Sequence, residues 1–279
     1  MGSGMLPYAH ATTTVSLGKA GNYVILAQAI IVTTGTSSIM GNVGLSPGNA
    51  SSLVGFGLKL DSSGTFATSP IVTGKVYANN YASPTEATLL AAISEMRLAF
   101  TSAQGRSTTV SEGTTNLNGQ TLSAGVYTWK GDAAMTGDIT LSGSSSDVWV
   151  FQVPGTLTVS NGVTVKLSGG ATYNNVFWQV LGATTIGKTV NFQGIILDAS
   201  DFFMQTGSTL TGRVMTEMGV SLQSNTIGAP AVPTTTSTSS SVPEFPNAAV
   251  AVIAVVALAA VGIFSKRSSA SSRMSSKTT

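Results

Sequence analysis

A short internal repeat in the carboxyl-terminal half of the chain limits the folds that this sequence can adopt. Phe192-Gln193-Gly194 recurs as Leu210-Thr211-Gly212, at an offset of eighteen residues. Phe151-Gln152-Val153 matches Trp178-Gln179-Val180 at an offset of twenty-seven, which equals one such period plus an insertion. Three short strands and three turns in about eighteen residues make up one rung of a parallel β-helix. The repeat therefore predicts stacked rungs.

Short strands divided by glycine fill the region from residue 108 to residue 227. An antiparallel sandwich is the alternative architecture, but it explains only the strand lengths and not the repeat. Alternation along the strands predicts the positions that face the interior, namely Val150, Val153, Leu157, Val159, Val163, Val165, Phe192, Ile196 and Leu210. It predicts an outward face that carries hydroxyl groups, at Thr156, Thr158, Thr164, Thr209 and Thr211.

One strong helix signal precedes this region. Ser83 is expected as the N-cap, Pro84 at the first helical position and Glu86 as the capping-box residue, and Gly105 stands at the expected stop. We therefore predict a long α-helix over about residues 84–104, packed alongside the strands through one apolar stripe, formed by Leu89, Ile93, Met96 and Phe100.

The charged residues are few, and the basic ones gather at the C-terminus. The chain has 13 Lys and Arg against 11 Asp and Glu, and the last fourteen residues contain four of the basic residues. Before residue 230 the net charge is therefore about −1, and no basic stripe exists that could neutralise phosphates. We predict no nucleic-acid partner. The absence of cysteine excludes disulfides, thiolate catalysis and cysteine-based zinc sites.

The two ends of the chain predict a membrane-anchored protein. Residues 248–264 are uncharged and apolar, and Lys266 and Arg267 follow them. We predict a Ser/Thr/Pro stalk over residues 229–246, a transmembrane helix over 247–265 and a basic cytoplasmic tail over 266–279. This arrangement places the domain of residues 12–228 on the extracellular face of the cell membrane. Residues 1–11 are interpreted as the remnant of a signal peptide or of cloning.

Catalytic constellations are absent from the sequence pattern. A single histidine, His10, lies in the segment assigned to the leader, so the domain has none for a Ser-His-Asp relay. Two aspartate pairs could act as glycosidase carboxylates or Ca²⁺ ligands, but aspartates on rung turns more often cap backbone amides; the pairs are Asp132 with Asp138 and Asp198 with Asp201. We predict no catalytic residue, cofactor or metal site. Asn49 begins an N-glycosylation sequon.

Six ordered sequence blocks between residues 17 and 227 carry a resemblance to a known family. They are LGKAGNY with ILA at residues 17–27, GNVGLSPG at 41–48, LSAGVY at 122–127, DVWVFQV at 147–153, NVFWQV at 175–180 and TGSTLTGR at 206–213. In these blocks the chain resembles the ice-binding (antifreeze) proteins, which implies an irregular right-handed β-helix with a long helix alongside. The VPEFP element at residues 242–246, followed by the apolar segment, resembles an archaeal surface-anchoring signal.

The resemblance implies an ice-binding face that is flat and rich in threonine. The family's Thr-(Ala/Gly)-x-(Thr/Asn) element occurs literally once, at residues 206–209. The residues expected on the face are Thr33, Thr156, Thr158, Thr184, Thr206, Thr209, Gly219 and Ser221. Asp201, Phe203 and Met218 fall on the same expected face and do not suit ice. A purely structural explanation is that these threonines are good strand formers.

We therefore predict a non-catalytic protein that adsorbs to ice through this face and is displayed on the cell surface. The alternative is an adhesin or surface-layer component that uses the same scaffold to bind a glycan or a cell-surface protein. A β-helical enzyme acting on polysaccharides is the third hypothesis, and the scattered carboxylates and the missing histidine count against it.

Overall fold

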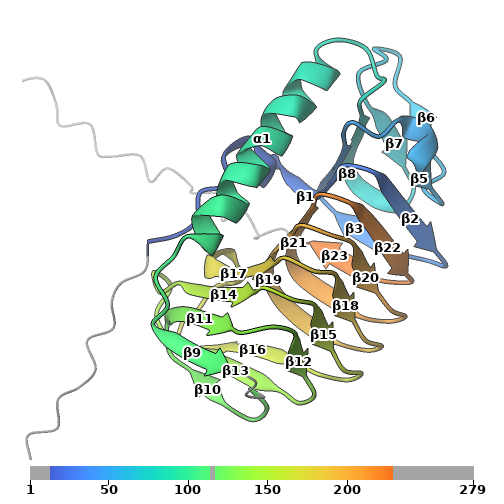
Figure 1. The fold of residues 1–279 in the computed structure, drawn as a ribbon. Coiled ribbons are helices and arrows are strands. Elements are labelled where there is room, and N and C mark those ends of the chain that lie inside the picture. The colour runs from blue at the N-terminus through green and yellow to red at the C-terminus, as the bar shows by residue number, and fades with distance from the viewer. Residues whose placement is uncertain (1–12, 114–116, 229–279) are drawn as a thin grey trace, which may run out of the picture. The chain divides into compact units, whose positions relative to one another are not determined.

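Parallel strands wind into a stack of rungs, and one long helix lies along a side of the stack (Figure 1). The computed structural model describes residues 13–113 and 117–228. The predicted fold is confirmed in its main features: the protein is mainly β, its strands are parallel and solenoid-like, and a single α-helix accompanies them. The right-handed sense of the winding stays a prediction.

Three sets of strands form the sides of the stack. The side next to the helix has the order β9 (Val110–Gly113), β11 (Gly125–Trp129), β14 (Trp149–Val153), β17 (Val176–Val180), β19 (Asn191–Asp198), β21 (Thr209–Thr216), β1 (Tyr23–Ala27), β4 (Asn42–Leu45) and β8 (Val72–Ala78). The second side is a seven-stranded sheet, called here the face sheet, with the order β12 (Ala133–Met135), β15 (Leu157–Val159), β18 (Thr184–Ile186), β20 (Phe202–Met204), β22 (Gly219–Gln223), β2 (Ile30–Thr34) and β5 (Leu53–Val54).

The third side joins shorter strands to the first halves of two long ones. It contains β10 (Thr121–Leu122), β13 (Ile139–Ser142), β16 (Val165–Ser168), the starts of β19 and β21, β23 (Thr226–Gly228) and β3 (Ser38–Met40). Two antiparallel strands, β6 (Lys59–Leu60) and β7 (Ala67–Ser69), extend beside β8. Three 3-10 helices complete the described chain, η1 (Gly18–Asn22), η2 (Ala50–Ser52) and η3 (Tyr173–Asn175).

The rung length is eighteen residues only in the later rungs. Phe177 pairs with Ile195, and Ile195 pairs with Arg213, so each of these steps spans 18 residues. The earlier steps are longer, because Val126 pairs with Val150 and Val150 with Phe177. Their extra residues lie in the turns that lead into β14 and β17, the second of which contains η3. A uniform eighteen-residue rung therefore does not describe the whole stack.

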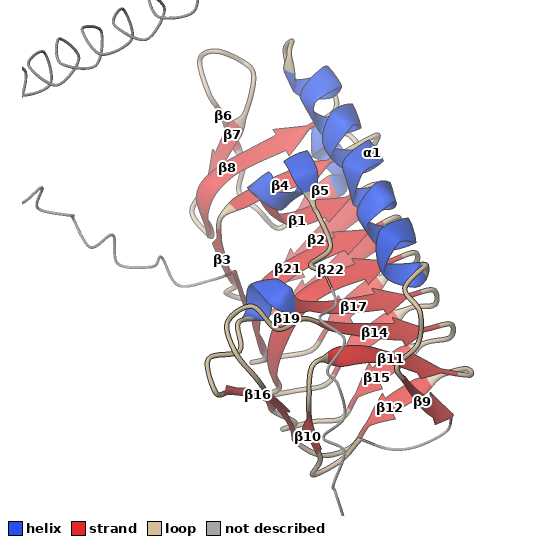
Figure 2. Cartoon of the chain, turned by 90° about the vertical axis from the view of Figure 1, so that its left-hand side faces the viewer, coloured by secondary structure: helices blue, strands red, loops and turns tan. Residues whose placement is uncertain are grey.

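The amino-terminal strands stack on the last rung of the solenoid. β1 pairs with β21, β2 with β22 and β3 with β23, all in parallel. Figure 1 shows these blue strands beside the orange ones. Helix α1 (Thr85–Gln104) then leads the chain along the stack to β9, at the opposite end (Figure 2). The sequence repeat did not predict this stacking, since the N-terminal strands and the last rung share no recognisable motif.

The interior of the solenoid contains a ladder of stacked aromatic rings. The rings of Phe151 and Trp178 lie 3.9 Å apart between centroids and are nearly parallel, and those of Tyr127 and Phe192 continue the ladder on either side. Eight of the nine positions predicted to face inward belong to this core, but Val150 packs against α1 instead. All five residues of β14 are buried, so polarity alternation could not tell its two faces apart.

Helix α1 covers the outer surface of the first side. Leu89, Ile93 and Met96 are buried against it, as the predicted stripe requires, and Phe100 is half-buried. Gly105 ends the helix as predicted, but the helix begins at Thr85 after Pro84, without a side-chain cap. The capping role assigned to Ser83 and Glu86 is therefore wrong.

The side-chain amide of Gln152 fixes the other end of the helix. Its Nε2 donates hydrogen bonds to the carbonyl oxygens of Ala103, Gln104 and Arg106, at 2.8, 2.9 and 2.9 Å. The last carbonyls of a helix have no partner within the helix, so a buried amide from β14 satisfies them. The strand thus holds the helix end on the stack.

The predicted membrane location is corrected by the structure. Within residues 13–113 and 117–228, no helix combines the length and the apolar character needed to cross a membrane. This finding contradicts an extracellular location held by a single C-terminal span. The leader (1–11), the stalk (229–246) with its VPEFP element, the span (247–265) and the tail (266–279) all lie outside the described residues.

Gly212 provides a test of close rung stacking. It has a φ of 151° and pairs with Gly194 of the preceding rung, and a Cβ at this position would overlap the Gly194 carbonyl oxygen. We expect Gly212→Ala to lower the free energy of unfolding by about 2 kcal/mol or more. Urea unfolding measures this change as a lower midpoint concentration, with an unchanged dependence of the free energy of unfolding on urea concentration.

Gly131→Ala is the matched control, because a Cβ there would meet no atom within 4 Å. It should leave the midpoint nearly unchanged. Equal effects of the two substitutions would contradict close stacking at Gly212.

Candidate functional site

The outer surface of the face sheet is a regular exposed surface. Its strand pairs keep one register across all seven strands, without a bulge. Because side chains alternate along a strand, the middle residue of each three-residue strand points outward. The residues that pair in this way, called here the outer row, are Ala134, Thr158, Thr185, Phe203, Ser221, Val32 and Val54.

Two further rows flank the outer row, and all their members except the buried Gly187 and Gly219 are exposed or half-buried. They occupy positions two residues before and two residues after it, as the period of a strand requires. One contains Asp132, Thr156, Ala183, Asp201, Gly219 and Ile30, and the other contains Thr136, Ser160, Gly187, Gln205, Gln223 and Thr34. The three rows together present hydroxyl, methyl and amide groups with little formal charge, together with the exposed apolar side chains of Ile30, Val54 and Phe203.

The only carboxylates in these three rows are engaged by the backbone. Asp132 Oδ1 accepts a hydrogen bond from the Thr156 amide at 2.7 Å, and Asp201 Oδ1 accepts one from the Gly219 amide at 2.9 Å. The bond from Thr156 also lowers the pKa of Asp132 below its ordinary value. Each aspartate therefore caps the next rung, which is the role expected of aspartates on turns.

The other two aspartates of the candidate pairs are also occupied. Asp138 accepts a hydrogen bond from the Thr164 amide at 2.9 Å and forms an ion pair with Lys166 at 2.8 Å. Asp198 Oδ1 accepts a hydrogen bond from the Ser200 amide at 2.8 Å. Among the described residues, no three or more side chains of the metal-binding types cluster together.

Six of the eight predicted face residues fall into four places. Thr158 and Ser221 lie in the outer row, and Thr156 and Gly219 lie in a flanking row. Thr206 lies in the turn after β20. Thr209 begins β21 on the third side of the stack, where its hydroxyl donates to Asn191.

The structure places Thr33 and Thr184 in the interior, which corrects their predicted position on the face. They are 4% and 0% exposed, and each pairs with residues of the core. Strand alternation is the reason, because Thr184 lies one position from Thr185, and only one of two adjacent side chains faces outward. Ile186 is buried and lies two residues after Thr184 in the same strand. Alternation from Ile186 would therefore have placed Thr184 inward and Thr185 outward.

Three residues that did not suit ice are exposed or partly exposed. Phe203 is 43% exposed in the outer row, and Met218 is 47% exposed in the turn before β22. Asp201 is half-buried, and its carboxylate is engaged as described. The outer row is therefore a mixture of apolar and hydroxyl groups.

A family model described as Ice-binding-like matches residues 25–228, which include every strand of the face sheet. This chain belongs to the ice-binding family. An ice-binding protein of Leucosporidium sp. (strain AY30) is 40% identical over 234 residues, which cover 83% of this chain and 90% of that protein. The ice-binding protein K3-B1 of Typhula ishikariensis is 44% identical over 187 residues, 66% of this chain and 77% of that protein.

Solved structures of other family members share the fold. A glycosylated ice-binding protein from an Arctic yeast superposes with a TM-score of 0.76 at 40% identity, over 79% of this chain and 96% of that one. An ice-binding protein from an Antarctic biological consortium gives a TM-score of 0.69 at 31% identity, over 79% and 93% of the two chains. The irregular solenoid of this family member is thus a shared architecture.

A buried carboxyl group lies at the corner between β19 and the face sheet. Asp198 is 2% exposed, and its Oδ2 has no hydrogen-bond partner. Burial raises the pKa of Asp198 to about 7, with the charge of Asp201 adding to the effect and the hydrogen bond from the Ser200 amide opposing it. The folded protein therefore retains this proton at a higher pH than the unfolded chain does.

This carboxyl group predicts how stability depends on pH. Since its folded pKa is raised, its protonated form supports the fold below about pH 4, and that support is lost as the pH rises towards 7. We expect the free energy of unfolding to fall by as much as roughly 4 kcal/mol between pH 4 and pH 8. Asp198→Asn should flatten this slope, measured by urea unfolding across the range.

Asp132→Asn is the control, because the carboxyl group of Asp132 has a lowered pKa and stays ionised from pH 5 to pH 8. It should shift the stability curve without changing its slope in that range. A wild-type slope that persists in Asp198→Asn would show that another group titrates.

Proposed function

We propose that this protein binds ice, and that the outer row and its two flanking rows form the binding surface. The observation that carries the proposal is the unbroken register of seven parallel strands on a chain of the ice-binding family. The related proteins from Leucosporidium and Typhula are named for ice binding, which supports the same function here.

The spacing of the strands suits an ordered layer of water. Adjacent strands in a sheet lie about 4.8 Å apart, so side chains in register repeat at that interval. The threonine and alanine methyls of the outer row favour cage-like water around them, and the hydroxyls hold that water by hydrogen bonds. Such a layer would freeze onto a crystal through many weak contacts.

The proposed set of ice-binding residues differs from the sequence prediction. It keeps Thr156, Thr158, Gly219 and Ser221, and it adds four outward residues of the same rows, Ala134, Thr185, Val32 and Thr34. Thr33 and Thr184 support the strands from the interior. Thr206 and Thr209 lie outside the three rows and are left out.

The exposed Phe203 side chain makes the centre of the proposed binding surface uneven. Its exposed ring stands in the outer row between Thr185 and Ser221. A ring is larger than the methyl groups on either side, so the flat and threonine-rich face of the sequence prediction becomes a mixed apolar and hydroxyl face in this proposal. No catalytic step is needed for such a surface, and we infer a non-catalytic role.

A bulky substitution in the outer row tests the proposal. We expect Thr158→Tyr to remove most of the freezing-point depression and ice-crystal shaping, because the ring would displace the ordered water. A nanolitre osmometer measures both effects. The melting temperature of the protein should change little, since Thr158 is exposed and substitutions there cost less than about 0.5 kcal/mol.

Thr211→Tyr is the matched control, because Thr211 lies on the third side and pairs with Gln193. It should retain the activity of the unmodified protein. Gly219→Tyr is less suitable, since a Cβ there would press on Ile30 and Asp201. Unaltered ice crystals together with retention of a glycan or protein in a pull-down would favour the adhesin alternative instead.

A further inference from the structure

A polar groove lies beside the start of α1, away from the face sheet. It has a volume of about 420 Å³, within the range of about 300–1,000 Å³ found for small-molecule sites. The residues that line it come from η1, β1, β4, β8, the loop before β7 and the first turn of α1, and they are Asn22, Tyr23, Asn42, Thr65, Tyr77, Pro84, Thr85 and Thr88.

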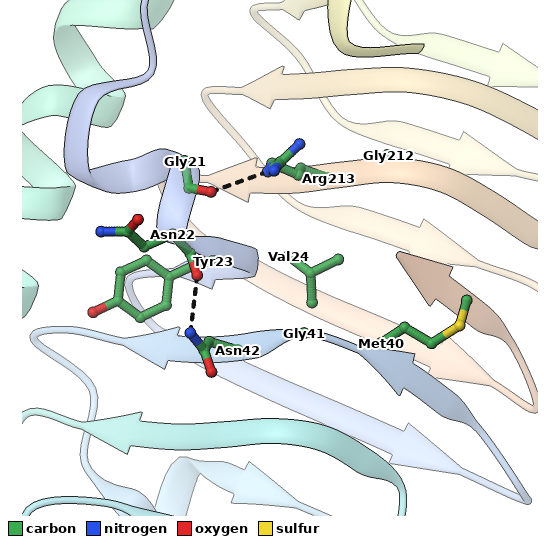
Figure 3. Close-up of a pocket in the computed structure, with 9 residues that line it drawn as sticks. All are labelled: Gly21, Asn22, Tyr23, Val24, Met40, Gly41, Asn42, Gly212 and Arg213. Carbon is green, nitrogen blue, oxygen red and sulfur yellow. Dashed lines mark hydrogen bonds between the residues drawn. The ribbon is translucent and has the colours of Figure 1, made fainter. Parts of the chain in front are cut away.

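A smaller hollow continues this groove. It holds about 120 Å³ and shares three lining residues with the groove, namely Asn22, Tyr23 and Asn42 (Figure 3). Arg213 borders it, but its guanidinium is engaged, with Nε donating to the Gly21 carbonyl at 3.3 Å and Nη1 to Asn174 Oδ1 at 3.1 Å. The Asn42 side chain donates to the Asn22 carbonyl at 3.1 Å, so a hydrogen bond joins two of the shared residues (Figure 3).

Two tyrosines supply the groove with phenol groups. The rings of Tyr23 and Tyr77 meet edge to face, with 5.9 Å between centroids, and Phe66 supports Tyr77 from the other side at 6.3 Å. Burial raises the pKa of Tyr23 to about 12 and raises that of Tyr77 as well, so both phenols stay protonated near neutral pH. Tyr77 is half-buried and can donate a hydrogen bond to a ligand, whereas Tyr23 is only 4% exposed.

The larger groove is uncharged throughout. Its eight lining residues contain hydroxyl, amide and aromatic groups and no Asp, Glu, Lys, Arg or His. The nearby ammonium of Lys75 lies 3.9 Å from the centroid of the Phe66 ring, and its side chain is occupied there. Neutral donors and acceptors beside aromatic rings match the hydroxyls and the apolar ring faces of a sugar, whereas an ionic ligand would find no counter-charge.

We propose that this groove is a second binding site, which takes a neutral sugar of one or two rings. Tyr77 and Asn22 would contact its hydroxyl groups, and the rings of Tyr23 and Tyr77 would border its apolar face. The groove lies next to the helix-covered side, and the face sheet is a different side of the stack, so the two sites do not share residues. A protein molecule adsorbed to ice through the face sheet would therefore leave this groove free to bind a sugar.

An NMR titration of the full chain tests this site. The probes are glucose, mannose, galactose, N-acetylglucosamine and cellobiose, each raised to tens of millimolar, with sodium phosphate as a charged comparison. We expect saturable shifts for at least one sugar at the backbone amides of residues 22–23, 42, 65, 77 and 85–88. Tyr77→Phe and Asn22→Ala should each weaken that binding about fivefold or more, because each removes a hydrogen-bonding group.

Two controls separate this site from the proposed ice surface and from general loss of structure. Tyr127→Phe removes a phenol at the other end of the stack, where it donates to the Ser123 carbonyl, and it should leave sugar binding unchanged. Thr158→Tyr should also leave it unchanged. The proposal is overturned if no sugar gives saturable shifts, if the shifts lie elsewhere, if phosphate gives the same shifts, or if both groove variants bind as the unmodified chain does.

Discussion

Parallel pairing in register between successive rungs is the constraint on which the rest of this structure depends. The strands of one rung find their hydrogen-bond partners in the rungs above and below, so the side chains of equivalent positions must stack. The aromatic ladder of Tyr127, Phe151 and Trp178 inside the solenoid follows from that register, and so does the outer row on the face sheet. The N-terminal strands extend the same register beyond the last rung.

The same register explains how a protein with few charged residues can present a defined surface. The carboxylates of Asp132 and Asp201 accept hydrogen bonds from backbone amides. The rows of the face sheet therefore contain no free carboxylate. The helix and its cap by Gln152 cover a second side. The proposed ice-binding surface and the proposed sugar groove therefore lie on different sides of one scaffold.

The sequence predicted the solenoid and the apolar stripe of α1, because both arise from local periodicity. It could not predict that β1 pairs with β21, since that contact joins distant segments without a shared motif. Val150 was assigned to the wrong side because its strand is buried on both faces. Thr184 was preferred over Thr185 because two adjacent threonines look alike, although the apolar Ile186 marks Thr184 as the inward one. The groove at Tyr23 and Tyr77 could not be predicted, because it depends on contacts between separate elements.

The most direct measurement of the central claim is magnetisation transfer from ice to the protein in frozen solution, read by solid-state NMR at assigned methyl groups. If the outer row lies against ice, the methyls of Ala134, Thr158, Thr185 and Val32 receive the signal first. Earlier transfer to the methyls of Thr211 and Thr226, on the third side, would contradict the account.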